Sequence, residues 1–138
     1  GVTLKLRKGE IHALVGENGA GKSTLMNILT GQFYMDSGEV LMEGEPIRFS
    51  SPREAMRKNI VLVPQELNLV PEASVAENVF LGNEVLSGRL INWKETAKEA
   101  ERLLDLLDVH VDVSQPVKNL SAAYQQLVSI ARALAYEP

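Results

Sequence analysis

Gly16-Glu17-Asn18-Gly19-Ala20-Gly21-Lys22-Ser23-Thr24 is the stretch that decides the fold of this chain. Its spacing is a glycine, four residues, and then Gly-Lys-Ser, which is typical of a loop that binds the phosphates of a nucleoside triphosphate. The apolar run 11–15 before it predicts a buried parallel strand. The apolar positions of 22–29 after it predict a helix with one buried face. A phosphate loop requires this strand–loop–helix context, so the surroundings support the motif.

The residue types in the loop predict how it would bind ATP and Mg²⁺. Glycines let the backbone turn tightly, so that successive N–H groups form a nest for an anion at the positive end of the following helix. Lys22 is the candidate catalytic residue that reaches the β- and γ-phosphates, and the Ser23 hydroxyl is the candidate magnesium ligand. Thr24 would lie near the α-phosphate. The alternative is a glycine-rich turn without a ligand, and the match in this context makes that alternative weak.

Composition limits the kind of protein this is. The chain has 138 residues, 45% of them hydrophobic, which is enough for one domain or part of one with a packed core. A net charge of −4 argues against nucleic acid as the main partner, because no basic stripe is present to neutralise phosphates. The absence of cysteine excludes disulfides and thiolate zinc sites. No apolar run approaches the ~20 residues of a membrane-spanning helix, and no signal peptide opens the chain.

Hydrophobic periodicity and turn residues predict an α/β first part followed by a helical part. Strands are expected at 2–6, 11–15 and 60–63, and an antiparallel hairpin at 39–42 and 45–49. Capping boxes begin helices at Ser51 and Ser74, ending near 58 and 81, and Asn92 begins a longer helix. A loop is expected at 109–118 and a last helix at 121–135. The expected division is therefore an α/β core part over 1–70, a helical subdomain over 71–120, and a final helical segment over 121–138.

Two further segments carry weaker signals. Gln65 follows the expected strand 60–63, and ligands bind at the carboxyl ends of such strands, although a polar loop residue is the simpler interpretation. In the segment Leu120-Ser121-Ala122-Ala123-Tyr124-Gln125, Ser121 is a helix cap, and the small residues leave the first N–H groups of the helix approachable. This is a second possible anion site, and an ordinary capped helix explains the pattern equally well.

Together these three segments resemble the ATP-binding subunit of an ABC transporter over nearly the whole chain. Gly16–Thr24 matches the Walker A loop of that family, Gln65 matches its Q-loop, and Leu120–Gln125 resembles its signature motif. The resemblance implies the P-loop NTPase fold of ABC ATPase type. It also implies that Gln65 helps to hold Mg²⁺ and to position water, and that the signature of one domain closes on ATP bound to a second domain.

The resemblance narrows to the subfamily that drives bacterial uptake of ribose, galactose or xylose. The stretches that carry it are 49–55, 65–71, 74–82 and 91–94. It implies two tandem ATP-binding halves, of which this would be the first, a membrane permease as partner, and a sugar-binding protein as an indirect partner. It also implies a peripheral position at the cytoplasmic face of the membrane. The sequence does not identify the sugar.

The chain departs from the family pattern in two ways. Ala122, Ala123 and Tyr124 stand where the family usually has Gly-Gly-Gln, and a Cβ there crowds the approach of backbone to the γ-phosphate. The chain also ends before the family's Walker B aspartate, catalytic glutamate and switch histidine. His12 and His110 do not fit the histidine's role and are expected to be structural. This chain alone is therefore expected to bind phosphates without turning over ATP.

Other functions remain open at this stage. A GTPase would need Asp-x-x-Gly and Asn-Lys-x-Asp elements, and neither is found. A non-transport ABC ATPase acting on DNA or ribosomes would need a basic surface. A nucleotide-sensing module without hydrolysis is compatible with the altered signature.

Overall fold

The computed structural model describes all 138 residues, and its first half contains short elements around the glycine-rich loop. In chain order these are α1 (Lys22–Leu29), β1 (Val40–Met42), β2 (Glu45–Ile47) and α2 (Pro52–Arg57). β1 and β2 pair antiparallel with Val40 opposite Ile47, which confirms the expected hairpin. Its two turn residues, Glu43 and Gly44, both have positive φ (53° and 87°), the backbone that matches the twist of a two-residue hairpin.

The three other strands expected in this half do not form. Residues 2–6, 11–15 and 60–63 pair with no neighbouring strand, and the side chains of Ile11 and Val15 are 100% and 89% exposed. A strand closes its backbone hydrogen bonds only with a neighbouring strand, and nothing in the structure lies beside these segments to provide one. The prediction of buried parallel strands is therefore wrong for this structure, although the apolar pattern that prompted it is real.

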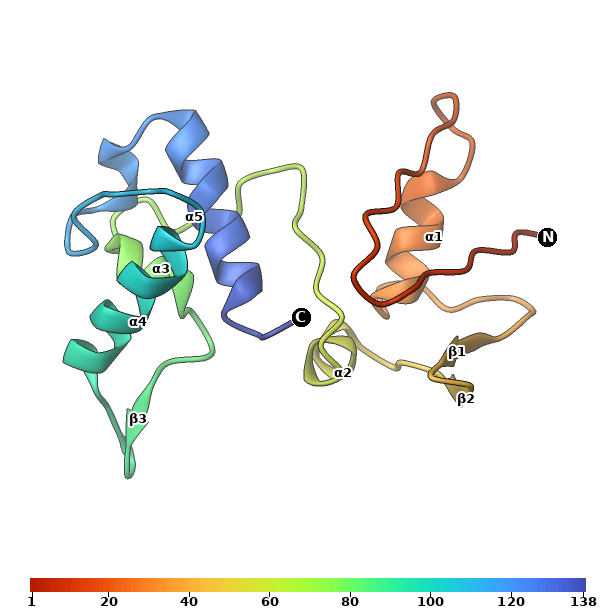
Figure 1. Cartoon of the computed structure of the whole chain (residues 1–138), viewed down its shortest axis with the longest axis horizontal. Helices are drawn as coiled ribbons and strands as arrows, with labels where there is room; N and C mark the ends of the chain where they lie inside the picture. Colours follow the sequence, from red (N-terminus) through yellow and green to blue (C-terminus); the bar gives the residue numbers. More distant parts are fainter.

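The second half is helical, as expected. It contains α3 (Val75–Val79), α4 (Trp93–Asp105), a 3₁₀ turn η1 (Val117–Asn119) and α5 (Ala122–Leu134). A small antiparallel hairpin of β3 (Leu86–Ser87) and β4 (Leu90–Ile91) precedes α4 and was not anticipated from the sequence. Figure 1 shows α1 and the β1–β2 hairpin at one side of the molecule, α3, α4 and α5 at the other, and α2 between them.

Side-chain caps begin three of the helices. Ser74 and Glu77 form the expected reciprocal capping box of α3: Glu77 N–H donates to Ser74 Oγ, and Ser74 N–H donates to the Glu77 carboxylate at 2.7 Å. Asn92 and Ser121 cap α4 and α5. The capping box expected at Ser51 does not form, because the Glu54 carboxylate accepts from Ser50 N–H instead and the Ser51 hydroxyl caps nothing.

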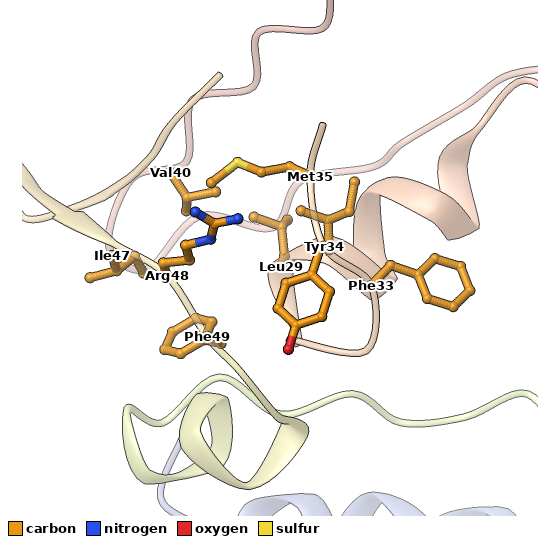
Figure 2. A pocket seen from close by; sticks show the side chains of 9 residues that line it. Leu29, Phe33, Tyr34, Met35, Val40, Ile47, Arg48 and Phe49 are labelled. Atoms are coloured by element: carbon orange, nitrogen blue, oxygen red, sulfur yellow. The ribbon is translucent and has the colours of Figure 1, made fainter. Parts of the chain in front are cut away.

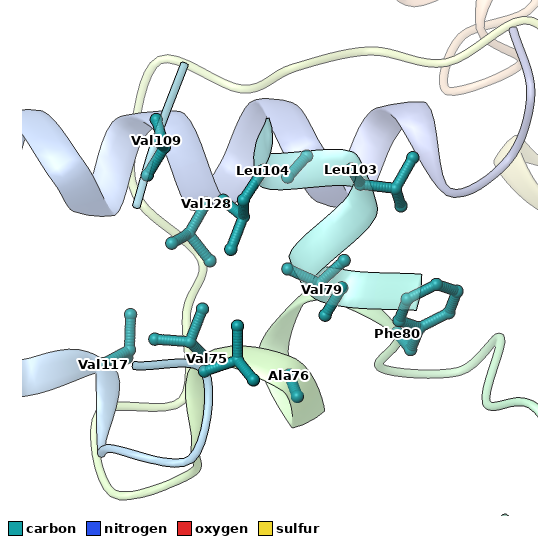
Figure 3. Packing of buried hydrophobic residues seen from close by; sticks show 12 residues of the cluster. Val75, Ala76, Val79, Phe80, Leu103, Leu104, Val109, Val117 and Val128 are labelled. Atoms are coloured by element: carbon teal, nitrogen blue, oxygen red, sulfur yellow. The ribbon is translucent and has the colours of Figure 1, made fainter. Parts of the chain in front are cut away.

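One hydrophobic core holds α3, α4 and α5 together. Val75 and Val79 of α3, Leu104 of α4 and Val128 of α5 are almost completely buried against one another, and Val117 closes the cluster from η1 (Figure 3). These positions recur at three- and four-residue spacing along their helices, which places them on the face turned to the neighbouring helix. None of the helices has both the length and the hydrophobicity needed to cross a bilayer.

Candidate functional site: the glycine-rich loop

The loop 16–21 leads directly into α1 through two glycines with left-handed backbone. Gly19 has φ 84° and Gly21 has φ 88°, which favours glycine because a side chain there meets its own backbone. Ala20 N–H donates to the Glu17 carbonyl at 3.1 Å, closing a turn inside the loop. A Cβ on Gly16 would lie 3.4 Å from the Ala20 Cβ, so the two ends of the turn approach closely. The backbone therefore turns sharply between Gly16 and Gly21, as the motif predicts.

The start of α1 presents free hydrogen-bond donors. Gly21 has no side chain to cap the helix, and the backbone N–H groups of Lys22, Ser23 and Thr24 meet no acceptor in the protein. The first N–H groups of a helix carry its partial positive charge and are normally satisfied by a cap, by water or by a bound anion. Three free donors at the start of a helix, next to a loop that can approach a ligand closely, are the arrangement that an anion site requires.

Lys22 folds back over the loop. Its ammonium donates to the carbonyl of Gly16 at 2.7 Å and to the carbonyl of Glu17 at 2.8 Å. The charge therefore lies at the two carbonyls that begin the loop. A phosphate in the loop would exchange these two neutral acceptors for a charged one, which forms the stronger hydrogen bond.

The hydroxyls of Ser23 and Thr24 make no hydrogen bond within the protein and are exposed. A hydroxyl oxygen is a hard donor of the kind that Mg²⁺ prefers. The structure contains no cluster of three or more His, Cys, Asp or Glu side chains that could hold a metal unaided. The residues present therefore fit a magnesium ion that arrives with nucleotide phosphates, in which the protein supplies one or two ligands and the phosphates supply others.

Gln65 is not brought to the loop by any hydrogen bond. It is exposed, follows Pro64, and lies in the irregular segment 58–74 that runs from α2 to α3. The strand expected to present it at a sheet edge is one of those that do not form. Its role as a magnesium or water ligand stays a prediction.

The segment 120–125 lies apart from the loop as well. Ser121 Oγ accepts from Tyr124 N–H at 3.4 Å, and the Gln125 side-chain amide donates to the Leu120 carbonyl at 3.0 Å. Ala122 and Ala123 are exposed, and their N–H groups meet no protein acceptor. In Figure 1 the start of α5 and the loop above α1 occupy opposite sides of the molecule. Any action of this segment on a nucleotide would therefore fall on a nucleotide held elsewhere.

A small apolar pocket lies beneath α1 and was not anticipated from the sequence. It is formed by Leu29, Val40, Ile47 and Phe49, with Tyr34 and Phe33 at its rim (Figure 2). Its one charged neighbour is Arg48, and the Tyr34 hydroxyl donates to the Ser50 carbonyl at 3.4 Å. The pocket lacks the polar groups that orient a ligand, so it is the packing between helix and hairpin and not a second candidate site.

Two polar residues that the sequence analysis passed over are bound into the helical half. Arg132 is the single charged residue of α5, and Asn78 is a fully buried amide in α3. Burial lowers the pKa of the Arg132 guanidinium from its ordinary value, although an arginine stays protonated in proteins. One signal was available: a lone arginine inside an otherwise uncharged helix needs a partner for its charge.

Comparisons with known proteins find relatives that match nearly the whole chain. The chain is 53% identical to the ribose import ATP-binding protein RbsA 2 of Rubrobacter xylanophilus, over 99% of this chain and 27% of that protein. It is 45% identical to the xylose import ATP-binding protein XylG of Geobacillus kaustophilus, over 96% of this chain and 27% of that protein. The chain thus spans about a quarter of the length of the curated relatives it matches.

A solved structure shows the same fold. The nucleotide-free ATP-binding cassette of an ABC transporter matches with a TM-score of 0.71 at 31% identity, over 88% of this chain and 52% of that one. The expected fold class, an α/β phosphate-loop fold of ABC ATPase type with a hairpin and a helical part, is confirmed at this level, while three of the expected strands stay unpaired. The family model for ABC transporters matches residues 1–138, and the chain therefore belongs to the ABC transporter family.

Proposed function

We propose that this chain forms the ATP-binding part of a subunit that drives uptake of a simple sugar through a membrane permease. The observation that carries the proposal is the loop 16–24, where three backbone N–H groups have no acceptor and the Lys22 ammonium donates to the Gly16 carbonyl. Its similarity to proteins named as ribose and xylose import ATP-binding proteins supports the sugar class. Because those relatives are nearly four times as long, the proposal concerns a polypeptide of their length that contains this chain.

Within this proposal each site residue has a stated role. The N–H groups of 16–24 bind phosphate oxygens, Lys22 neutralises charge on the β- and γ-phosphates, and Ser23 holds Mg²⁺. The magnesium ion, when bound, balances the negative charge that develops during phosphoryl transfer. Gln65 orients water and contributes an oxygen to the metal, and Leu120–Gln125 closes on the nucleotide of a second ATP-binding domain. The subunit would lie at the cytoplasmic face of the membrane against its permease, with a sugar-binding protein acting indirectly.

A titration with a fluorescent ATP analogue tests the first step on the chain itself. We expect saturable, Mg²⁺-sensitive binding that weakens at least tenfold in Lys22→Ala, because a charge-assisted contact to phosphate is lost. Lys98→Ala is the matched control, since Lys98 is an exposed lysine of α4 that pairs only with Glu95. Equal affinity in wild type and Lys22→Ala would contradict the assignment of the loop.

The second step needs the longer polypeptide with its permease. Proteoliposomes loaded with ATP and supplied with the sugar-binding protein should take up ribose, galactose or xylose, and Lys22→Ala should abolish uptake. ATP-dependent transport of none of these three sugars, by a preparation that binds ATP, would refute the sugar class while leaving the ATP site in place.

A further inference from the structure

The side chain of Arg132 connects α5 to the segment that follows Gln65. Its Nε donates to the Asn78 carbonyl at 2.7 Å, and one terminal nitrogen donates to the Asn68 carbonyl at 2.8 Å. The other terminal nitrogen donates to the Asn78 side-chain oxygen at 3.1 Å. The two ends of these contacts are 54 and 64 residues apart in the sequence. One guanidinium therefore joins three parts of the chain: α5, α3 and the segment beginning at Asn68.

Asn78 completes the attachment from α3. Its side-chain oxygen accepts from Val70 N–H at 2.8 Å, and its side-chain nitrogen donates to the Val70 carbonyl at 3.0 Å. The amide thus pairs with both backbone groups of Val70, as a neighbouring strand would. The same nitrogen also reaches the carbonyls of Ala73 and Ser74. Since the oxygen faces two obligate donors and the nitrogen faces three carbonyls, only one orientation of this amide satisfies all its partners.

These contacts make the backbone at 68 and 70 part of the helical half. Gln65 lies three residues before Asn68, and no hydrogen bond ties Gln65 itself to either half. The segment 120–125 begins α5, the helix that carries Arg132. The arginine is suited to this connection because its planar fork donates in several directions at once, whereas a lysine would reach one or two carbonyls without fixed geometry.

We propose that Arg132 is a positioning residue that, together with Asn78, holds the backbone at Asn68 and Val70 to α5 and so limits how far Gln65 can move relative to the segment 120–125. Any effect of this connection on ATP hydrolysis rests on the proposed function. Arg132 acts through its contacts with the carbonyls of Asn68 and Asn78 and with the Asn78 side-chain oxygen.

A distance measurement tests the connection without any activity. The chain has no cysteine, so spin labels can be placed at Glu66→Cys and Ala123→Cys, with Lys98→Cys and Ala123→Cys as a reference pair inside the helical half. We expect Arg132→Gln to broaden the 66–123 distance distribution at least twofold and to leave the 98–123 distribution unchanged. Arg102→Gln, an exposed arginine of α4 that pairs with Glu99, should change neither.

An unchanged 66–123 distribution in Arg132→Gln would overturn the proposal. The distance distribution of the reference pair will also broaden if loss of the guanidinium unfolds the helices. In that case the same two distributions are measured in Arg132→Lys, and they decide whether the proposal holds. A broadened 66–123 distribution with an intact reference pair supports the proposal, and a wild-type distribution in the lysine variant overturns it.

The ATPase kinetics of the longer polypeptide provide a second test, which measures function. If Arg132 acts through Gln65, Arg132→Gln should lower kcat for ATP hydrolysis about tenfold with KM unchanged, and should have little further effect in a Gln65→Ala background. Effects that multiply independently would overturn the link. A polypeptide without any ATPase activity would refute the proposed function, and the distance measurement would then decide the connection by itself.

Discussion

Residues 1–67 and 68–138 differ in where their apolar side chains and backbone hydrogen bonds find partners. All but two of the 18 buried residues, Thr30 and Ala55, lie between Val75 and Ala133. Large apolar side chains are exposed in both halves, but the two most exposed, Ile11 at 100% and Val15 at 89%, lie in the first half. A helix closes its backbone hydrogen bonds within itself and needs only a neighbouring face, whereas a parallel strand needs other strands on both edges. The half that carries the phosphate loop is therefore the less independently stable one.

The largest effect on stability is expected for Leu104→Ala in the helical core. Leu104 is almost fully buried between α3 and α5, so we expect a loss of about 3 kcal/mol in the free energy of unfolding. Urea unfolding followed by the fluorescence of the only tryptophan, Trp93 on α4, measures it. Leu106→Ala, whose side chain is 66% exposed, should cost less than about 0.5 kcal/mol. Similar losses in both variants would show that the core described here does not determine the stability of this half.

Gly31→Ala tests the first half. Gly31 has φ 69°, and a Cβ there would lie 2.8 Å from the Phe49 Cβ and 2.8 Å from the Ser51 carbonyl oxygen. We expect a local loss of about 2 kcal/mol from strain and overlap, seen as faster hydrogen exchange of the β1–β2 amides. Gly38→Ala, which has positive φ but nothing within 4 Å, isolates the overlap. A matching shift in the Trp93 unfolding midpoint would mean that the halves unfold together.

A pair of serine substitutions compares the caps of the two halves. Ser74→Ala removes the hydroxyl that accepts from Glu77 N–H and should cost about 1 kcal/mol. Ser51→Ala occupies the same cap position before α2, where the hydroxyl caps nothing, and should cost less than about 0.5 kcal/mol. Thermal unfolding of both variants measures the contrast. Equal costs would show that the capping box of α3 adds nothing.

The smallest effect expected is on pH dependence. Hydrogen bonds from the hydroxyl and the backbone N–H of Ser74 lower the pKa of Glu77 below its usual value of 4.5. A lowered pKa in the folded state stabilises the protein above the unfolded value, and the stabilisation disappears as pH falls through the folded value. Unfolding midpoints between pH 6 and pH 3 should therefore fall more steeply in wild type than in Glu77→Gln. If the midpoints of wild type and Glu77→Gln fell in parallel, Glu77 would not contribute to the loss of stability in acid.

The sequence predicted best what is determined locally. The starts of α3, α4 and α5, the caps at Ser74 and Ser121 and the hairpin at 40–47 all follow from spacings of a few residues, and the structure contains each of them, although α3 ends at Val79 and not near 81. The strand predictions at 2–6, 11–15 and 60–63 depended on neighbours that local pattern does not provide. These runs are apolar, but whether an apolar strand is buried depends on the neighbouring strands that pack against it.

The residues of the candidate site and its surroundings also differ in whether local sequence predicts them. The loop 16–24 was predictable because its glycines and Lys22 act through backbone that is close in sequence. The contacts of Arg132 were not predictable, since they join Asn68 and Asn78 to a residue more than fifty positions away. Periodicity assigns Arg132 to a helix face, and only the packing of α5 on α3 reveals what that face meets.

The two carbonyl contacts of Lys22 have a consequence for ligand discrimination. Because the ammonium is already satisfied by Gly16 and Glu17, an incoming molecule competes with the protein's own oxygens instead of filling an unmet need. A neutral sugar or an alcohol offers acceptors no better than those it displaces, and gains almost nothing from the lysine. A polyphosphate offers formal negative charge and gains the full difference between a neutral and a charge-assisted bond. If the loop binds a nucleotide as proposed, the two carbonyls that Lys22 already contacts would make it favour a charged phosphate over an uncharged solute.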